Sequence, residues 1–121
     1  MDLADNDGNT ALIIASVRNY GETARLLLEA RAETSLVDKD GDAALTHASA
    51  WGYLQIVRLL LAAFADTGSA NKVGRDALMD ASERGNVEVV RYLLEARAGV
   101  DMVDSDGHSA LTSAVSANQE E

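Results

Sequence analysis

The sequence predicts an all-α solenoid of stacked helix-turn-helix units, with a short β-hairpin-like turn between one unit and the next. Glycines recur with a constant period of 33 residues, at Gly8, Gly41, Gly74 and Gly107. A short helical pattern and then a longer one follow each of the first three glycines. A constant period of this length is typical of repeat proteins, in which each unit covers the apolar side of its neighbour.

Each unit begins with a tight turn, of which Asp38-Lys39-Asp40-Gly41 is the clearest copy. Asp and Asn tolerate tight bends, and Gly adopts backbone angles that other residues avoid. The Asp-x-Asp-Gly spacing is superficially that of a calcium loop. However, Leu36 and His47 stand where an EF-hand loop needs its first acid and its last, bidentate Glu. The residues therefore predict turns, and no metal site.

The first helix is predicted to begin after Thr10 and to end near Arg18, because the threonine hydroxyl can accept from the first free amides. Asn19 follows at the point where a left-handed residue ends a helix with least strain. Later copies have Gly52, Gly85 and Asn118 at this position.

Second helices are predicted at about residues 22–30, 54–63 and 87–96. Apolar residues at helical spacing define the two later copies. These are Ile56, Val57, Leu60 and Leu61, repeated as Val89, Val90, Leu93 and Leu94. The first copy has Thr23, Ala24, Leu27 and Leu28 at these positions, after Gly21. We therefore expect the first copy to be the weakest and to fray.

Length and charge narrow the choice of partners. The 121 residues are enough for one domain, and 20 acidic against 10 basic side chains give a formal net charge of −10. Such a charge repels phosphate backbones and anionic lipids, so we expect no nucleic-acid or membrane partner. The absence of cysteine fits a reducing compartment, and no secretory signal is visible. These features predict a cytoplasmic protein, with the nucleus as the alternative.

The recurring pattern resembles the ankyrin repeat family across nearly the whole chain. That family has Asp-x-x-Gly-x-Thr-Pro-Leu-His-x-Ala-x-x-x-Gly, then Val-x-x-Leu-Leu and Gly-Ala-Asp. The second copy carries the match through Asp38, Gly41, Leu45, Ala48, Gly52, Val57, Leu60, Leu61, Ala65 and Asp66. The resemblance implies a single domain, 1–121, with units 5–37, 38–70 and 71–103 and a partial unit 104–121. It also implies a non-enzymatic module that binds a protein or peptide in a concave groove.

The sequence departs from the family pattern at the start of the first helix of each unit and at the end of the second helix. Alanine replaces the proline at the first helical position, and the capping threonine of the second copy is Ala43. Loss of a cap costs about 1 kcal/mol. Arg31, Phe64 and Arg97 replace the glycine that ends the second helix. A side chain held at positive φ costs roughly 1–2 kcal/mol, so these helices either end differently or are strained.

No catalytic or cofactor-binding set can be assembled from the sequence. The two histidines, His47 and His108, are separated by nearly two units, and neither has an evident partner for nucleophilic catalysis. The glycines stand singly, so no phosphate-binding loop is present. We therefore expect no enzyme, no cofactor and no bound metal, and satisfied or solvated histidines.

The resemblance places the variable contact positions on the hairpin tips and on the exposed side of the first helices. The candidate partner-binding residues are Arg18, Lys39, Asp42, Trp51, Lys72, Arg75, Glu83 and Arg84. Trp51, the only tryptophan, is either a binding hot spot or a ring that lies flat on Arg18 or Arg84. The basic residues either attract an acidic molecule or pair with Asp40, Asp42 and Glu83.

Self-association is the competing hypothesis. A solenoid without polar caps exposes the apolar side that a next unit would cover, so copies of the chain can stack end to end. A self-associating or engineered structural scaffold is therefore the alternative to a partner-binding module. We expect a monomer, with end-to-end association as the exception.

Overall fold

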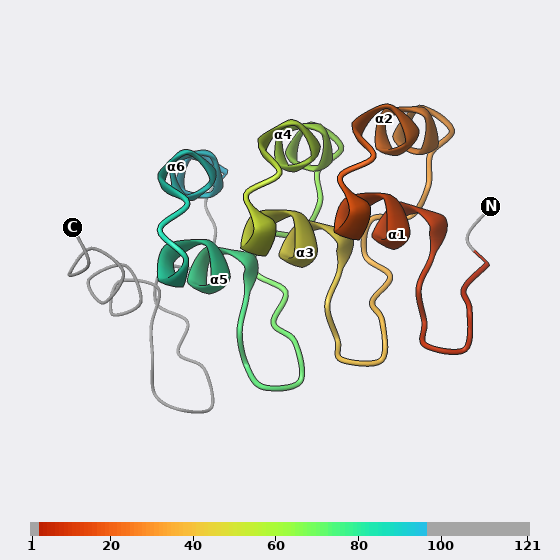
Figure 1. The fold of residues 1–121 in the computed structure, drawn as a ribbon, viewed down its shortest axis with the longest axis horizontal. Coiled ribbons are helices and arrows are strands. Elements are labelled where there is room, and N and C mark those ends of the chain that lie inside the picture. Colours follow the sequence, from red (N-terminus) through yellow and green to blue (C-terminus); the bar gives the residue numbers. More distant parts are fainter. Residues whose placement is uncertain (1–2, 97–121) are drawn as a thin grey trace.

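The computed structural model describes residues 3–96, and all structural statements below concern these residues. Figure 1 shows six helices arranged as three stacked pairs. They are α1 (Ala11–Arg18), α2 (Gly21–Glu29), α3 (Ala44–Trp51), α4 (Leu54–Ala62), α5 (Ala77–Glu83) and α6 (Val87–Glu95). The shorter helices α1, α3 and α5 form an inner row, and α2, α4 and α6 form an outer row. The predicted all-α solenoid is confirmed.

The core lies between the two helix rows and between neighbouring pairs. Each helix of a row packs on the next one, and each inner helix packs on the outer helix that follows it. Leu12, Leu45 and Leu78 recur at the same position of α1, α3 and α5, and none is more than 2% exposed. Burial of each such leucine stabilises the fold by about 1.5–3 kcal/mol. The repeat therefore keeps its spacing because equivalent apolar side chains fill equivalent sites.

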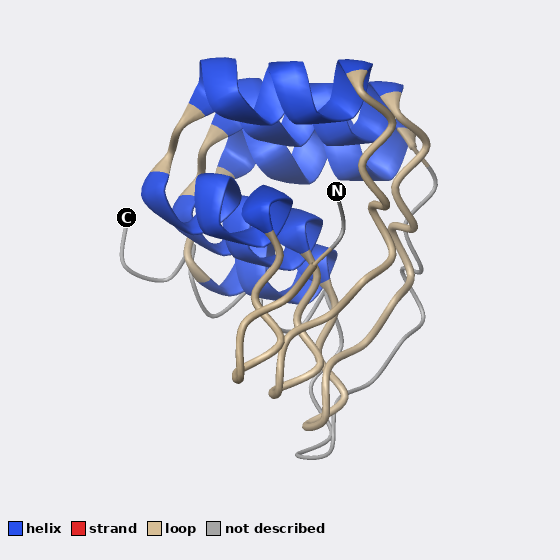
Figure 2. Ribbon diagram, turned by 90° about the vertical axis from the view of Figure 1, so that its right-hand side faces the viewer, coloured by secondary structure: helices blue, strands red, loops and turns tan. Residues whose placement is uncertain are grey.

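The hairpins extend from the inner row on one side of the molecule, as Figure 2 shows. In the second hairpin the Asp38 carboxylate accepts from the backbone amides of Asp40 (2.9 Å) and Asp42 (3.1 Å). In the third, the Asn71 side chain accepts from the amides of Val73 (3.0 Å) and Arg75 (3.1 Å). An acidic side chain and an amide thus close the same turn. The predicted turns are confirmed, and their first polar side chain is engaged by the backbone.

Neighbouring hairpins are joined by backbone hydrogen bonds. The Lys39 amide donates to the Asp7 carbonyl at 2.8 Å, and the Lys72 amide donates to the Asp40 carbonyl at 3.0 Å. Gly41 has φ +82°, and a Cβ there would come within 3.0 Å of the Lys72 nitrogen. A side chain at this position would therefore strain the turn and separate the hairpins.

Helix α1 begins and ends as predicted, whereas its equivalent α5 ends one residue earlier, at Glu83. Thr10 accepts from the Ile13 amide at 3.2 Å, and Asn19 ends α1 with φ 60°. Ala43 has no side-chain cap, yet its φ of −88° and ψ of 171° resemble the −84° and 168° of Thr10. Gly52 and Gly85 also have positive φ, whereas Asn118 lies outside the described residues.

The outer helices end one residue before the predicted positions. Ala30, Ala63 and Ala96 are C-caps with φ between −83° and −89°, and they close the last turns. The residue that follows is left-handed at Arg31 (φ 67°) and Phe64 (φ 62°), and Arg97 lies outside the described residues. The helices therefore end as in a glycine-terminated repeat, with side chains held at positive φ.

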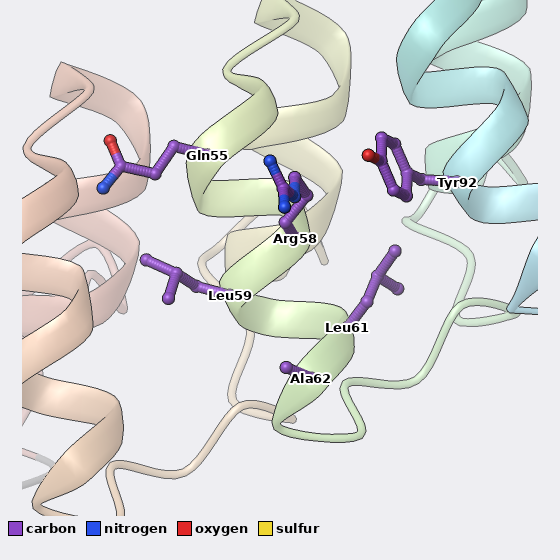
Figure 3. Close-up of a pocket in the computed structure, with 6 residues that line it drawn as sticks. All are labelled: Gln55, Arg58, Leu59, Leu61, Ala62 and Tyr92. Carbon is purple, nitrogen blue, oxygen red and sulfur yellow. The ribbon is translucent and has the colours of Figure 1, made fainter.

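Leu94 is one of the apolar residues at helical spacing, but its side chain is not buried. Leu94 is 48% exposed, although its equivalent Leu61 is partly buried. Figure 3 shows Leu61 pointing from α4 towards α6. By the repeat, Leu94 leaves α6 on the side away from α4, where no described helix packs on it. In the weaker α2 only Ala24 is buried, and its predicted fraying stays a prediction.

Candidate interaction surface

The eight predicted partner-binding residues lie on two kinds of segment. Lys39, Asp42, Lys72 and Arg75 belong to the hairpins, whereas Arg18, Trp51, Glu83 and Arg84 stand at the ends of α1, α3 and α5. We call the surface that the hairpins and the exposed side of the inner helices share the inner face. Repetition places one hairpin and one inner helix end in each unit, so equivalent residues form rows across the stack (Figure 1).

Trp51 lies in the middle of one such row. Arg18, Trp51 and Arg84 are spaced 33 positions apart in the sequence. They stand at equivalent helix ends, as the last residues of α1 and α3 and the C-cap of α5. The Arg84 Cζ atom lies 5.1 Å from the centroid of the Trp51 ring, within cation–π range. Trp51 nevertheless remains 55% exposed. The stacking on Arg84 is therefore observed, and more than half of the ring is still open to a partner.

Arg75 does not present a free charge. Its Nε atom lies 2.9 Å from Asp80 Oδ1, and its Nη2 atom lies 2.7 Å from Glu83 Oε2. The side chain is only 17% exposed. The predicted pairing with Glu83 is thus observed, and the sequence analysis missed Asp80. The spacing of Asp80 and Glu83 on α5 placed both acids on one helix face, but the direction of the hairpin decided which cation reached them.

Lys39 is also paired, whereas two other cations are not. Lys39 Nζ lies 3.6 Å from Asp7 Oδ1 in the preceding hairpin, and both side chains are well exposed. The side chains of Arg18 and Lys72 are exposed and make no hydrogen bond or ion pair with a described residue. Exposed pairs contribute little, about 0–1 kcal/mol, so the Lys39 pair can be exchanged for a partner's charge.

His47 joins the hairpin of its own unit to α3. Its Nε2 atom lies 2.8 Å from Asp38 Oδ2. Burial raises the pKa of Asp38, but hydrogen bonds from His47 and from the amides of Asp42 and Asp40 outweigh it and hold the pKa below its usual value. The expectation of a satisfied histidine is confirmed for His47, and His108 lies outside the described residues.

Asp42 stands beside this pair in a less favourable environment. Burial raises its pKa, and the hydrogen bond that Asn71 Nδ2 donates to Asp42 Oδ1 at 2.9 Å lowers it only in part. Asp38, Asp42 and His47 can each offer one ligand atom, and these atoms lie within 4.8 Å of one another. Both oxygens of Asp38 already accept hydrogen bonds from the turn and from His47. The cluster is therefore accounted for as a hydrogen-bonded connection between hairpin and helix.

A depression lies on the outer row of helices. It has a volume of about 570 Å³ and is lined by Gln55, Arg58, Leu59, Leu61, Ala62 and Tyr92 (Figure 3). The Arg58 Cζ atom lies 5.6 Å from the Tyr92 ring centroid. None of the predicted site residues lines this depression. We give more weight to the inner face, because protein partners are held by exposed anchors such as Trp51 and need no deep cavity.

Comparison with known sequences agrees with the repeat pattern. A family model described as ankyrin repeats, three copies, matches residues 1–71 and 63–121. No curated protein matches the chain. Among residues 3–96, no helix is both long and apolar enough to cross a membrane.

Proposed function

Because this chain belongs to the ankyrin repeat family, whose domains are generally protein-binding modules, we propose that it binds a protein or peptide on the inner face, centred on Trp51. The exposure of Trp51 supports this proposal above all. A tryptophan offers a large apolar ring and one N–H donor, and such residues dominate the energetics of protein interfaces. Here the ring is 55% exposed in the middle of a row of equivalent helix ends.

The residues around Trp51 suit recognition by shape and charge. The core beneath the inner face is well packed, since Leu45 and Ala48 of α3 are at most 2% exposed. A partner therefore meets a largely preformed surface, and binding requires little rearrangement. Ankyrin repeats are typically non-catalytic, and the match is to no enzyme family. We propose a non-enzymatic, cytoplasmic or nuclear module of repeat units 5–37, 38–70, 71–103 and 104–121.

The test compares Trp51→Ala with a matched outer-row variant, Tyr92→Ala. Both substitutions remove a ring that an arginine contacts, at 5.1 Å for Trp51 and 5.6 Å for Tyr92. A partner is isolated by pull-down with the wild type, and its affinity for each purified variant is then measured. We expect Trp51→Ala to weaken binding about tenfold or more, as at other hot spots, and Tyr92→Ala to change it less than about twofold.

Stability is measured alongside, so that loss of folding is not mistaken for loss of binding. Because Trp51 is more than half exposed, its removal is expected to change the free energy of unfolding by about 1 kcal/mol at most. An affinity within about twofold of the wild type for folded Trp51→Ala would place the binding centre elsewhere.

Self-association remains the alternative function, and one exposed residue favours it. Leu26 on α2 is 57% exposed. Its equivalent Leu59 points from α4 towards α2 in Figure 3, so Leu26 leaves α2 on the side away from α4. Light scattering over a concentration series separates the two functions. A particle mass that stays monomeric at high concentration excludes association through this side.

A further inference from the structure

Two arginines at the helix ends of the inner face have no acidic partner among residues 3–96. Arg18 and Arg84 flank Trp51 in the row of equivalent positions, and neither forms an ion pair with a described residue. The acids nearest to them in sequence are already paired, Glu22 with Arg25 and Glu83 with Arg75. Asp40, which forms no ion pair with a described residue, belongs to a hairpin at the opposite end of α3 from Trp51. Eight helical residues separate these two ends by about 12 Å.

From this row we infer that the partner held at Trp51 is an acidic segment in extended conformation, with two carboxylates that bind Arg18 and Arg84 and an apolar side chain on the exposed indole. The inference rests on the proposed function and specifies the chemistry of the partner. Packed helices stand about 8–10 Å apart, so positions two helices apart are separated by about 16–20 Å. An extended chain advances about 3.3 Å per residue. Because Arg84 leans towards Trp51, the two carboxylates stand at most about five or six residues apart.

The stacking of Arg84 on Trp51 favours this partner. A guanidinium over an aromatic ring keeps its positive charge, and its edge remains free to donate to a carboxylate. The contact also holds the long side chain near the middle of the row, so that less conformational freedom is lost when the partner binds. Both arginines can form two hydrogen bonds with a carboxylate, but only Arg84 is held in place by the Trp51 ring before the partner binds.

The formal net charge of −10 does not prevent this recognition. The Debye length is about 8 Å at physiological ionic strength, so acids farther away than that are largely screened. Two acids near the row, Asp80 and Glu83, share the single positive charge of Arg75, and Asp7 contacts Lys39. Arg18 and Arg84 themselves make no ion pair with a described residue, so the carboxylates of a partner meet two available guanidinium groups.

Trp51 provides the readout, because it is the only tryptophan of the chain. The probe is a capped Ser/Gly peptide with two glutamates about six residues apart and a phenylalanine between them. It is titrated against the full chain while tryptophan emission is followed. We expect a saturable change in emission that weakens as salt is added. A peptide with lysines in place of the glutamates is expected not to bind, and one with adjacent glutamates is expected to bind less tightly.

Three arginine variants decide whether the two ends of the row act as proposed. Arg18→Gln and Arg84→Gln are each expected to lower the affinity for the glutamate peptide about fivefold. This is the upper end of the effect measured for exposed charge pairs. Arg58→Gln is the matched control, because it removes an arginine that contacts a ring on the outer row. It is expected to leave the affinity within about twofold. Equal losses in all three variants, or equal binding of the lysine peptide, would overturn the inference.

The outcomes also separate this inference from the proposed function. If the glutamate peptide does not bind while an isolated partner still depends on Trp51, the acidic partner is wrong and the proposed function stands. If neither the peptide nor the isolated partner depends on Trp51, both are wrong.

Discussion

The side-chain amide of Asn86 donates to the backbone carbonyl of Ser49 at 3.1 Å, and also to that of Ala50 at 3.2 Å. One residue of the third unit thus satisfies two carbonyls at the end of α3 in the second unit. Asn86→Asp has the same shape but no amide donor, and it brings a negative charge towards two carbonyls. We expect it to lower the free energy of unfolding by about 1–3 kcal/mol.

Urea denaturation of the variant and the wild type measures this change. Asn6→Asp is the matched control, because it makes the same chemical change on an exposed side chain of the first hairpin. The control is expected to stay within about 0.5 kcal/mol of the wild type. Similar losses in both variants would show that added negative charge matters, and not the contact between units.

Phe64→Gly should stabilise the protein. Phe64 is held at φ 62° and is 92% exposed, so almost no packing is lost when its ring is removed. Relief of the left-handed strain contributes about 1–2 kcal/mol, and the added flexibility of the unfolded chain offsets part of it. We expect a net gain of about 0.5–1 kcal/mol, measured by denaturation. Ala63→Gly, at φ −89°, has no such strain to relieve and should not stabilise.

A cap can be restored at α3. Ala43 is only 7% exposed and provides no side-chain hydrogen bond, although its backbone angles match those of Thr10. Ala43→Thr should therefore place a hydroxyl near the first free amides of α3 and raise the free energy of unfolding by about 1 kcal/mol. Ala43→Val has nearly the shape of threonine without the acceptor. If valine stabilises as much as threonine, packing and not capping is responsible.

The pH dependence of stability should change sign between two aspartates. Burial raises the pKa of Asp76, although the carboxylate caps α5 by accepting from the Met79 amide at 2.9 Å. A raised pKa means that the folded state holds its proton more tightly than the unfolded state does. This contribution is complete below the usual value of 3.8 and is lost as pH rises through the folded pKa. Asp76→Thr, which keeps a cap, should gain stability over the wild type at pH 7, and the gain should shrink towards pH 4.

Asp38 provides the opposite case, because its pKa is lowered. Its contribution is present above the usual value of 3.8 and is lost as pH falls through the folded pKa. Asp38→Asn can still close the turn as Asn71 does, but it should be less stable than the wild type at neutral pH and approach it in acid. Denaturation at a series of pH values measures both variants. Parallel curves for Asp38→Asn and the wild type would contradict the assignment.

The sequence predicted the helices because each weak local signal is repeated at a fixed spacing. Gly21 and Thr23 are poor evidence for a helix alone, yet their equivalents in α4 and α6 identify α2. The ends of the outer helices were less accessible, since an alanine continues a helix as readily as it caps one. The exposure of Leu94 depends on which helices pack beside α6, and local periodicity does not encode that.

The positions of the candidate surface residues could be predicted from the sequence, whereas their ion-pair partners could be predicted only in part. Repeat equivalence put Trp51 between Arg18 and Arg84, and the structure has these residues at corresponding helix ends. The engagement of Arg75 with Asp80 was not predicted, because it depends on how a long, flexible side chain leaves its hairpin. The repeat spacing predicts on which segment a side chain lies. Which residue it contacts depends on the direction in which the side chain leaves the folded backbone.

The first unit and the second enter their inner helices through nearly the same backbone angles, with threonine in one copy and alanine in the other. The backbone of each unit is thus fixed largely by its packing against the neighbouring units. Single residues can therefore be substituted without a change in the stack, and the exposed row can be altered one side chain at a time, by evolution or by protein engineering.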